Sequence, residues 1–311
     1  MAKVACIGTG LVGSAWAVVF SRGGHTVSLF DSGGGEVEPR TRAAILETLE
    51  MLDRSSALTE PVADIEARIS FAPTLADAIT DTVHVQESVK EDIQVKQAVF
   101  AEIGRHAPAD AVLASSTSAF AGSLFMDFDG AERGLVAHPV NPPSLIPLVE
   151  LCGTPKTSAE TVERAKTFMT ELGMKPIVIR KEIDGFILNR LQYTLVAEAL
   201  HLVGEGYCDA ADIDRVITDG LALRWSTIGP FEVAHLNSPH GYEGFVNHLG
   251  DMMRRMGRNA NTAYDWPEGL TEAVHAEMVK RVPLDQLKAR QAWRDENILA
   301  TRQVQHDAEK R

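Results

Sequence analysis

Short apolar runs alternate with stretches of helical periodicity from the N-terminus to about residue 182. Apolar runs bounded by turn residues are typical of buried strands, and apolar positions three or four apart indicate helices. This alternation predicts a mainly parallel sheet with helices on both faces, the doubly wound α/β class. We expect strands at 4–7, 26–30, 82–86, 111–114, 135–137, 148–151 and 177–179, and helices at 14–22, 43–54, 62–68, 93–106 and 159–172.

The pattern changes at Ile183-Asp184-Gly185, beyond which helical periodicity dominates. One long apolar stripe comprises Leu188, Leu191, Leu195, Ala199 and Leu202. Further helices are expected at 212–221, 245–258, 270–282 and 284–305. We therefore predict an α/β domain over residues 1–182 and an all-helical C-terminal domain over residues 183–311.

A glycine-rich turn joins the first predicted strand to the first predicted helix. Gly8, Gly10 and Gly13 form the pattern GxGxxG, in which the glycines allow a tight turn, close approach of a pyrophosphate and close helix packing. Asp31 ends the second predicted strand, 18 residues after Gly13. An acid at this place accepts hydrogen bonds from the adenosine ribose and repels a 2′-phosphate, which favours NAD over NADP. We therefore predict a Rossmann-type NAD site and prefer it to the alternative, a strand–helix–strand unit that binds no ligand.

Composition excludes several classes of function. The chain has 311 residues, a formal net charge of −13 and 45% hydrophobic residues. An acidic protein lacks the basic surface that nucleic acids or anionic membranes require, and no apolar run approaches the ~18 residues of a membrane span. Three scattered cysteines and an N-terminal strand predict a reduced, cytoplasmic protein without a secretion signal. The histidines form no ligand cluster, so no metal site is expected.

Four polar residues are expected at the carboxyl ends of the strands, where open α/β sheets bind ligands. Ser118 and His138 each follow a predicted strand, Glu150 lies near the end of the next, and Asn189 opens the helical domain. Alcohol oxidation needs a base for the hydroxyl proton, and imidazole suits this near neutral pH. A carboxylate would orient it, while Ser118 and Asn189 would bind the substrate oxygen. Taken singly, each residue has a structural interpretation as well, such as a helix cap or a surface acid.

The segments GTGLVG, SSTS, HPVNPP, LVEL, EIDGFILNRLQY, DGLALRW and IGPFE resemble the L-3-hydroxyacyl-CoA dehydrogenase superfamily. Within it, the chain is most similar to the branch of λ-crystallin and L-gulonate 3-dehydrogenase, with HPVNPP as the branch marker. The resemblance implies His138 and Glu150 as the catalytic pair and Ser118 and Asn189 as substrate contacts. It implies a homodimer formed through the helical domain, and cofactor contacts at Leu11, Val12, Asp31, Glu91 and Lys96.

The substrate stays open between a free hydroxy acid and a CoA thioester. Between Asp31 and Thr59 the chain departs from the branch pattern, and only scattered arginines stand there, without a compact group for CoA phosphates. This favours a small hydroxy acid, whose carboxylate Arg224 would bind; a surface arginine is the alternative interpretation. Two rival functions remain: an L-3-hydroxyacyl-CoA dehydrogenase, and a non-catalytic, crystallin-like NAD-binding protein.

Overall fold

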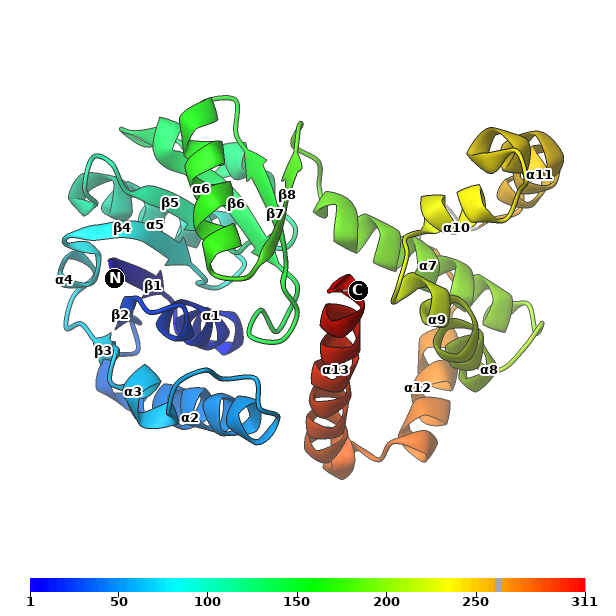
Figure 1. Ribbon diagram of the computed structural model, residues 1–311, viewed down its shortest axis with the longest axis horizontal. Helices are drawn as coiled ribbons and strands as arrows, with labels where there is room; N and C mark the ends of the chain where they lie inside the picture. The colour runs from blue at the N-terminus through cyan, green and yellow to red at the C-terminus, as the bar shows by residue number, and fades with distance from the viewer. Residues whose placement is uncertain (261–264, 311) are drawn as a thin grey trace. The chain divides into compact units, whose positions relative to one another are not determined.

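The computed structural model describes residues 1–260 and 265–310. The chain forms two compact units, Met1–Asn189 and Arg190–Arg311. The first unit holds the eight strands, coloured from blue β1 to green β8 in Figure 1. The fold class is as predicted, with a mainly parallel sheet followed by helices. The predicted domain boundary between residues 182 and 183 stays a prediction.

The first unit alternates strands and helices along the chain. Its strands are β1 Lys3–Ile7, β2 Thr26–Phe30, β3 Ile69–Phe71, β4 Thr82–Glu87, β5 Val112–Ser115, β6 Gly134–Pro139, β7 Leu148–Gly153 and β8 Lys175–Ile179. Its helices are α1 Leu11–Arg22, α2 Glu38–Arg54, α3 Val62–Glu66, α4 Leu75–Ile79, α5 Ile93–His106 and α6 Ala159–Glu171, and α7 Phe186–Gly204 leads into the second unit. The sequence did not predict β3 and α4, which are too short to show a clear periodicity.

The strands follow the order β3-β2-β1-β4-β5-β6-β7-β8 in a single sheet. Neighbouring strands are parallel except for the antiparallel pair β6 and β7. Strand order reverses between β1 and β4, and ligands of open α/β sheets bind outside the carboxyl ends of the strands at such a switch point. The carboxyl ends of β1 and β4 are therefore the expected place for a dinucleotide.

Helices cover both faces of the sheet. On one face α1 and α6 meet, where the rings of Phe20 and Phe168 stack with centroids 5.9 Å apart. On the other face α4 and α5 close a fully apolar core that contains Ala78, Val85 and Phe100. Local signals define the helix starts: Asp92 caps α5 by accepting from the Val95 N–H at 3.1 Å.

The second unit is helical throughout its described part. It contains the remainder of α7 and α8 Ala210–Arg215, α9 Ala222–Trp225, α10 Pro230–Leu236, α11 Gly241–Gly257, α12 Leu270–Arg281 and α13 Leu287–Glu309. The helix predicted for 212–221 continues from α8 into a π-helical segment, Val216–Leu221. Across residues 1–260 and 265–310, no helix combines the length and apolar character that a bilayer crossing requires.

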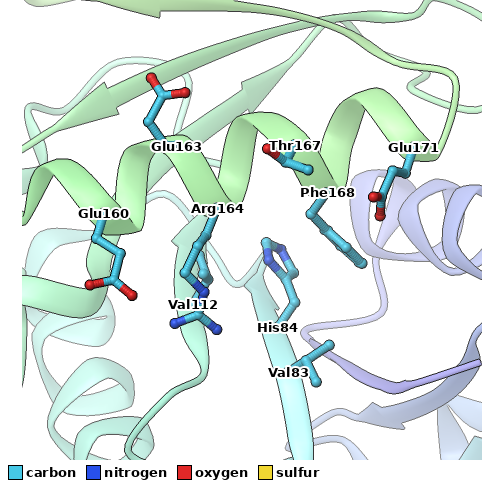
Figure 2. A pocket seen from close by; sticks show the side chains of 9 residues that line it. All are labelled: Val83, His84, Val112, Glu160, Glu163, Arg164, Thr167, Phe168 and Glu171. Atoms are coloured by element: carbon cyan, nitrogen blue, oxygen red, sulfur yellow. The ribbon is translucent and has the colours of Figure 1, made fainter.

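His84 is a buried polar residue in the face covered by α1 and α6. Its ring stacks on Phe168 at 5.0 Å, and Nε2 lies 3.0 Å from Gln86 Oε1. Figure 2 shows it below α6, with Arg164 and Phe168 extending toward it beside a cavity of about 360 Å³. Val83 and Val112 place this cavity at the amino ends of β4 and β5, and none of the predicted site residues lines it. Burial lowers the pKa of His84 to about 4, although the hydrogen bond with Gln86 opposes the change.

This buried imidazole predicts a loss of stability in acid. Below pH 6.5 the unfolded chain takes up a proton at His84, whereas the folded chain takes it up only near pH 4, so stability falls across that window. We expect the wild type to lose roughly 2 kcal/mol more than His84→Gln between pH 7 and pH 5. Urea unfolding of both proteins at the two pH values measures this difference. An equal loss would contradict the prediction.

Candidate active site

The three glycines of the turn meet three different constraints. Gly8 has a φ of +89°, and a Cβ there would lie 2.6 Å from the Ser88 carbonyl oxygen. A Cβ on Gly13 would lie 1.9 Å from the Gly8 carbonyl oxygen, so only glycine lets α1 approach β1 this closely. A Cβ on Gly10 would meet no atom within 4 Å. Gly10 thus borders open space that a side chain would fill and a pyrophosphate can use.

The start of α1 suits the negative charge of that pyrophosphate. The first hydrogen bond within the helix runs from the Ser14 N–H to the Gly10 carbonyl at 2.9 Å. The N–H groups of Leu11, Val12 and Gly13 precede it and lie at the positive end of the helix dipole. The Leu11 side chain is exposed and Val12 is half-buried. These residues fit an NAD phosphate at the helix start.

Asp31 lies beside the turn. Its Oδ2 accepts from the Thr9 N–H at 2.8 Å, and its Oδ1 accepts from the Gly33 N–H at 3.0 Å. Oδ2 also accepts from the Thr9 hydroxyl at 3.1 Å, whereas Oδ1 keeps a second lone pair with which the half-buried carboxylate can accept from a ribose hydroxyl. The bonds within the protein hold the carboxylate next to the turn, as ribose recognition requires.

His138 and Glu150 are brought together by the one antiparallel strand pair. They are directly opposite in the register of β6 and β7. His138 Nδ1 lies 2.8 Å from Glu150 Oε2, and both side chains are almost fully buried. The Phe186 ring lies against the imidazole, with centroids 5.2 Å apart. A carboxylate on Nδ1 selects the tautomer whose lone pair is on Nε2, the form that can take up a proton.

The same carboxylate holds the start of α7. Glu150 Oε1 accepts from the N–H groups of Ile187 and Leu188 at 2.9 and 3.0 Å. These are two of the N–H groups that a helix leaves unpaired in its first turn. The helix start and the imidazole thus satisfy both oxygens of a wholly buried carboxylate.

Ser118 and Asn189 also come together. The Asn189 side-chain amide donates to the Ser118 carbonyl at 2.8 Å, and among residues 1–260 and 265–310 its second N–H and its Oδ1 have no other partner. The exposed Ser118 lies in the segment 116–119 after β5, and the Gly185 N–H donates to the Ala119 carbonyl at 3.1 Å. Residues 185–189 therefore contact the pair of His138 and Glu150 and also hold the Ser118 segment, through Gly185 and Asn189.

Glu91 also holds the Ser118 segment. Its Oε1 accepts from the Thr117 hydroxyl and from the Ser118 N–H at 3.1 Å. Partial burial raises the pKa of Glu91, but the bond from Thr117 and the nearby Lys96 charge more than reverse this, so the pKa lies below its ordinary value. A charged acceptor thus fixes the backbone of the predicted substrate contact.

Lys96 lies between two carboxylates and is almost fully buried. Its Nζ is 2.9 Å from Glu87 Oε1 and 3.2 Å from Glu91 Oε2. With its donors engaged in this way, Lys96 positions Glu91, and its direct contact with the cofactor stays a prediction.

The sequence analysis did not predict a role for Glu87. The available signal was an acid at the carboxyl end of a buried strand. Burial raises the pKa of Glu87, while the Lys96 charge opposes the change.

Arg224 lies in α9 of the second unit and is exposed. Its predicted contact with a substrate carboxylate stays a prediction. Within the described part of the chain, His, Cys, Asp and Glu side chains nowhere gather in threes as metal ligands. The fold and the glycine turn together define an NAD-binding α/β protein with a buried histidine–carboxylate pair.

Comparison with known proteins supports this class. The family described as 3-hydroxyacyl-CoA dehydrogenase, NAD binding domain, matches residues 3–183, and the C-terminal domain of the same enzyme matches residues 185–279. The chain therefore belongs to the 3-hydroxyacyl-CoA dehydrogenase family, as its motifs indicate.

Three proteins illustrate the range of the relatives. Lambda-crystallin of Oryctolagus cuniculus is 39% identical over 94% of this chain and 93% of its own. L-carnitine dehydrogenase of Oceanobacillus iheyensis is 39% identical over 76% of both chains. The crystal structure of 5-formyl-3-hydroxy-2-methylpyridine 4-carboxylic acid 5-dehydrogenase, an NAD⁺-dependent dismutase, has a TM-score of 0.85 and 25% identity. It covers 98% of this chain and 99% of that one.

The different surroundings of Gly10 and Gly13 predict different effects of alanine. Gly10→Ala should keep the wild-type melting temperature but weaken NADH binding by ~10-fold or more, because its methyl group occupies the space beside the helix start. Gly13→Ala should lower the melting temperature, because its methyl group meets the Gly8 carbonyl. Thermal unfolding and NADH fluorescence titration separate the two. Equal melting temperatures for both variants would contradict this interpretation.

Proposed function

We propose that the chain catalyses the NAD-dependent oxidation of the 3-hydroxyl of a small, free hydroxy acid, with L-gulonate or a similar sugar acid as substrate. The observation that carries this proposal is the buried hydrogen bond of 2.8 Å between His138 and Glu150. Membership of an NAD-dependent hydroxyacyl dehydrogenase family supports the reaction class.

His138 acts as the general base. Its Nδ1–H donates to Glu150, so the lone pair of Nε2 takes up the proton of the substrate hydroxyl. Glu150 then stabilises the imidazolium, as the acid does in a hydrolase triad. Ser118 and Asn189 bind the substrate oxygen as its charge changes. NAD would supply the hydride acceptor when bound, and the glycine turn, Asp31 and Glu91 would hold it.

A free acid is favoured over a CoA thioester by the state of two of the arginines on or near α2. Arg42 pairs with Glu38 at 2.8 Å, and Arg68 forms an ion pair with Glu60. Guanidinium groups engaged by carboxylates are poor candidates for CoA phosphates. The family name keeps 3-hydroxyacyl-CoA as the second candidate substrate, and the carnitine enzymes among the relatives add L-carnitine as a free 3-hydroxy acid to test.

We further propose that the protein is a cytoplasmic homodimer formed through its helical part. Large apolar side chains are exposed along the helices of the second unit, including Leu191 on α7, Leu223 on α9 and Phe231 on α10. Exposed apolar side chains of this size are a frequent feature of association surfaces. Three free cysteines are consistent with a reducing compartment.

A substrate panel tests the function. We expect NADH formation from L-gulonate or another small 3-hydroxy acid, with NAD preferred over NADP, and little from L-3-hydroxybutyryl-CoA. Absorbance at the NADH band measures each rate. Activity with the thioester alone would replace our proposal by the acyl-CoA function, and inactivity on the whole panel together with tight NADH binding would favour a structural role.

Loss of the imidazole should stop proton transfer and leave the cofactor site intact. We expect His138→Ala to lower kcat by ~10²–10⁴-fold, the usual contribution of general acid–base catalysis, with NADH affinity unchanged. His106→Ala, which removes a surface imidazole at the end of α5, is the matched control. Near wild-type turnover of His138→Ala would remove this residue from the mechanism.

A further inference from the structure

Ser88 lies at the switch point of the sheet, directly beside the glycine turn. It follows Glu87, the last residue of β4, and its N–H donates to the Ile7 carbonyl at 2.7 Å. Its carbonyl oxygen is the atom that a Cβ on Gly8 would meet, and its own Cβ lies 3.5 Å from where a Cβ on Gly13 would stand. The half-buried Ser88 hydroxyl therefore borders the place predicted for the dinucleotide.

Three polar groups converge on the hydroxyl of Ser116. Trp16 Nε1 lies 3.1 Å from Ser116 Oγ, Gln86 Nε2 lies 2.7 Å from it, and Ser88 Oγ lies 2.9 Å from it. These side chains come from α1, from β4 and from the segments that follow β4 and β5. The cluster thus joins α1, the helix after the glycine turn, to the carboxyl ends of β4 and β5.

The direction of each bond in this cluster is fixed. An indole N–H only donates. Gln86 Nε2 also donates to the Ala137 carbonyl at 3.4 Å, which can only accept, and this sets the orientation of the amide. Gln86 Oε1 then accepts from His84 Nε2, the imidazole seen under α6 in Figure 2. Trp16 and Gln86 are therefore both donors to Ser116.

This leaves only one position for the Ser116 proton. A hydroxyl has two lone pairs and one hydrogen. Trp16 and Gln86 take both lone pairs, so the Ser116 hydrogen points to Ser88 Oγ. Ser88 must then direct its own hydrogen elsewhere, and within the described residues its hydroxyl has no further hydrogen-bond partner.

We propose that Ser88 donates a hydrogen bond to a phosphate or ribose oxygen of bound NAD, with its proton directed outward by Ser116. The hydroxyl of Ser88 is then a cofactor contact that the glycine pattern and Asp31 do not include. A chain of hydrogen bonds polarises its last donor, so His84, Gln86 and Ser116 strengthen this contact from inside the fold.

NADH binding in the absence of substrate tests the contact. We expect Ser88→Ala to raise the NADH dissociation constant by ~3–10-fold, as the loss of one hydrogen bond predicts. Ser88→Thr keeps the hydroxyl and should restore most of the affinity. Ser21→Ala, which removes a buried α1 hydroxyl bonded to the Val18 carbonyl, is the matched control and should bind NADH as the wild type does.

A double-mutant cycle tests the direction of the proton. Ser116→Ala should weaken NADH binding in the wild type but not in Ser88→Ala, because Ser116 acts through Ser88. Melting temperatures confirm that each variant is folded. Unchanged affinity of Ser88→Ala, or equal effects of Ser116→Ala in both backgrounds, would overturn the proposal. Since no hydroxy acid is present, a failure here differs from failure of the proposed dehydrogenase activity, which the substrate panel reports.

Discussion

The candidate site depends on the register of the single antiparallel strand pair in the sheet. Parallel strands are separated by crossover helices, whereas β6 and β7 are joined by a short loop, so two residues only 12 positions apart stand face to face. The side-chain period of a strand is two, so a slip of one residue would send Glu150 to the opposite face of the sheet from His138. The apolar neighbours Val149 and Leu151, both fully buried, hold this register.

Glu150 combines two structural demands in one carboxylate. A buried charge is costly unless its oxygens are satisfied, and here the imidazole satisfies one oxygen while two helix N–H groups satisfy the other. Glu150 thereby serves as the acceptor for the first turn of α7, which has no N-cap side chain of its own. The orientation of His138 and the position of Asn189, the fourth residue of α7, are therefore set by the same group.

The sequence predicted those parts of the fold whose signals are local. The glycine turn, the strand that precedes Asp31 and the long stripe of α7 each follow from spacing within one segment. The short β3 and α4 show no such spacing. The role of Ser116 could not be predicted either, because its partner Trp16 belongs to a helix that only the folded sheet brings near. Glu87 had the signal of an acid at the end of a buried strand, but its bond to Lys96 also depends on the fold. Glu91 and Lys96, which the resemblance implies as cofactor contacts, form an ion pair with each other at 3.2 Å.

Gln86 and Glu87, consecutive residues at the end of β4, belong to two separate hydrogen-bond networks. Glu87 faces α5, where its bond to Lys96 positions Glu91 and thereby the Ser118 segment. Gln86 faces α1 and α6, where it donates to Ser116. Because strand residues alternate between faces, one central strand can order the cofactor side of the site from both faces. The proposed proton-transfer pair belongs to β6 and β7, two and three strands away. The proposed cofactor contact Ser88 and the proposed proton-transfer pair thus depend on different strands, so substitution of Gln86 should act on cofactor affinity and substitutions on the antiparallel pair on turnover.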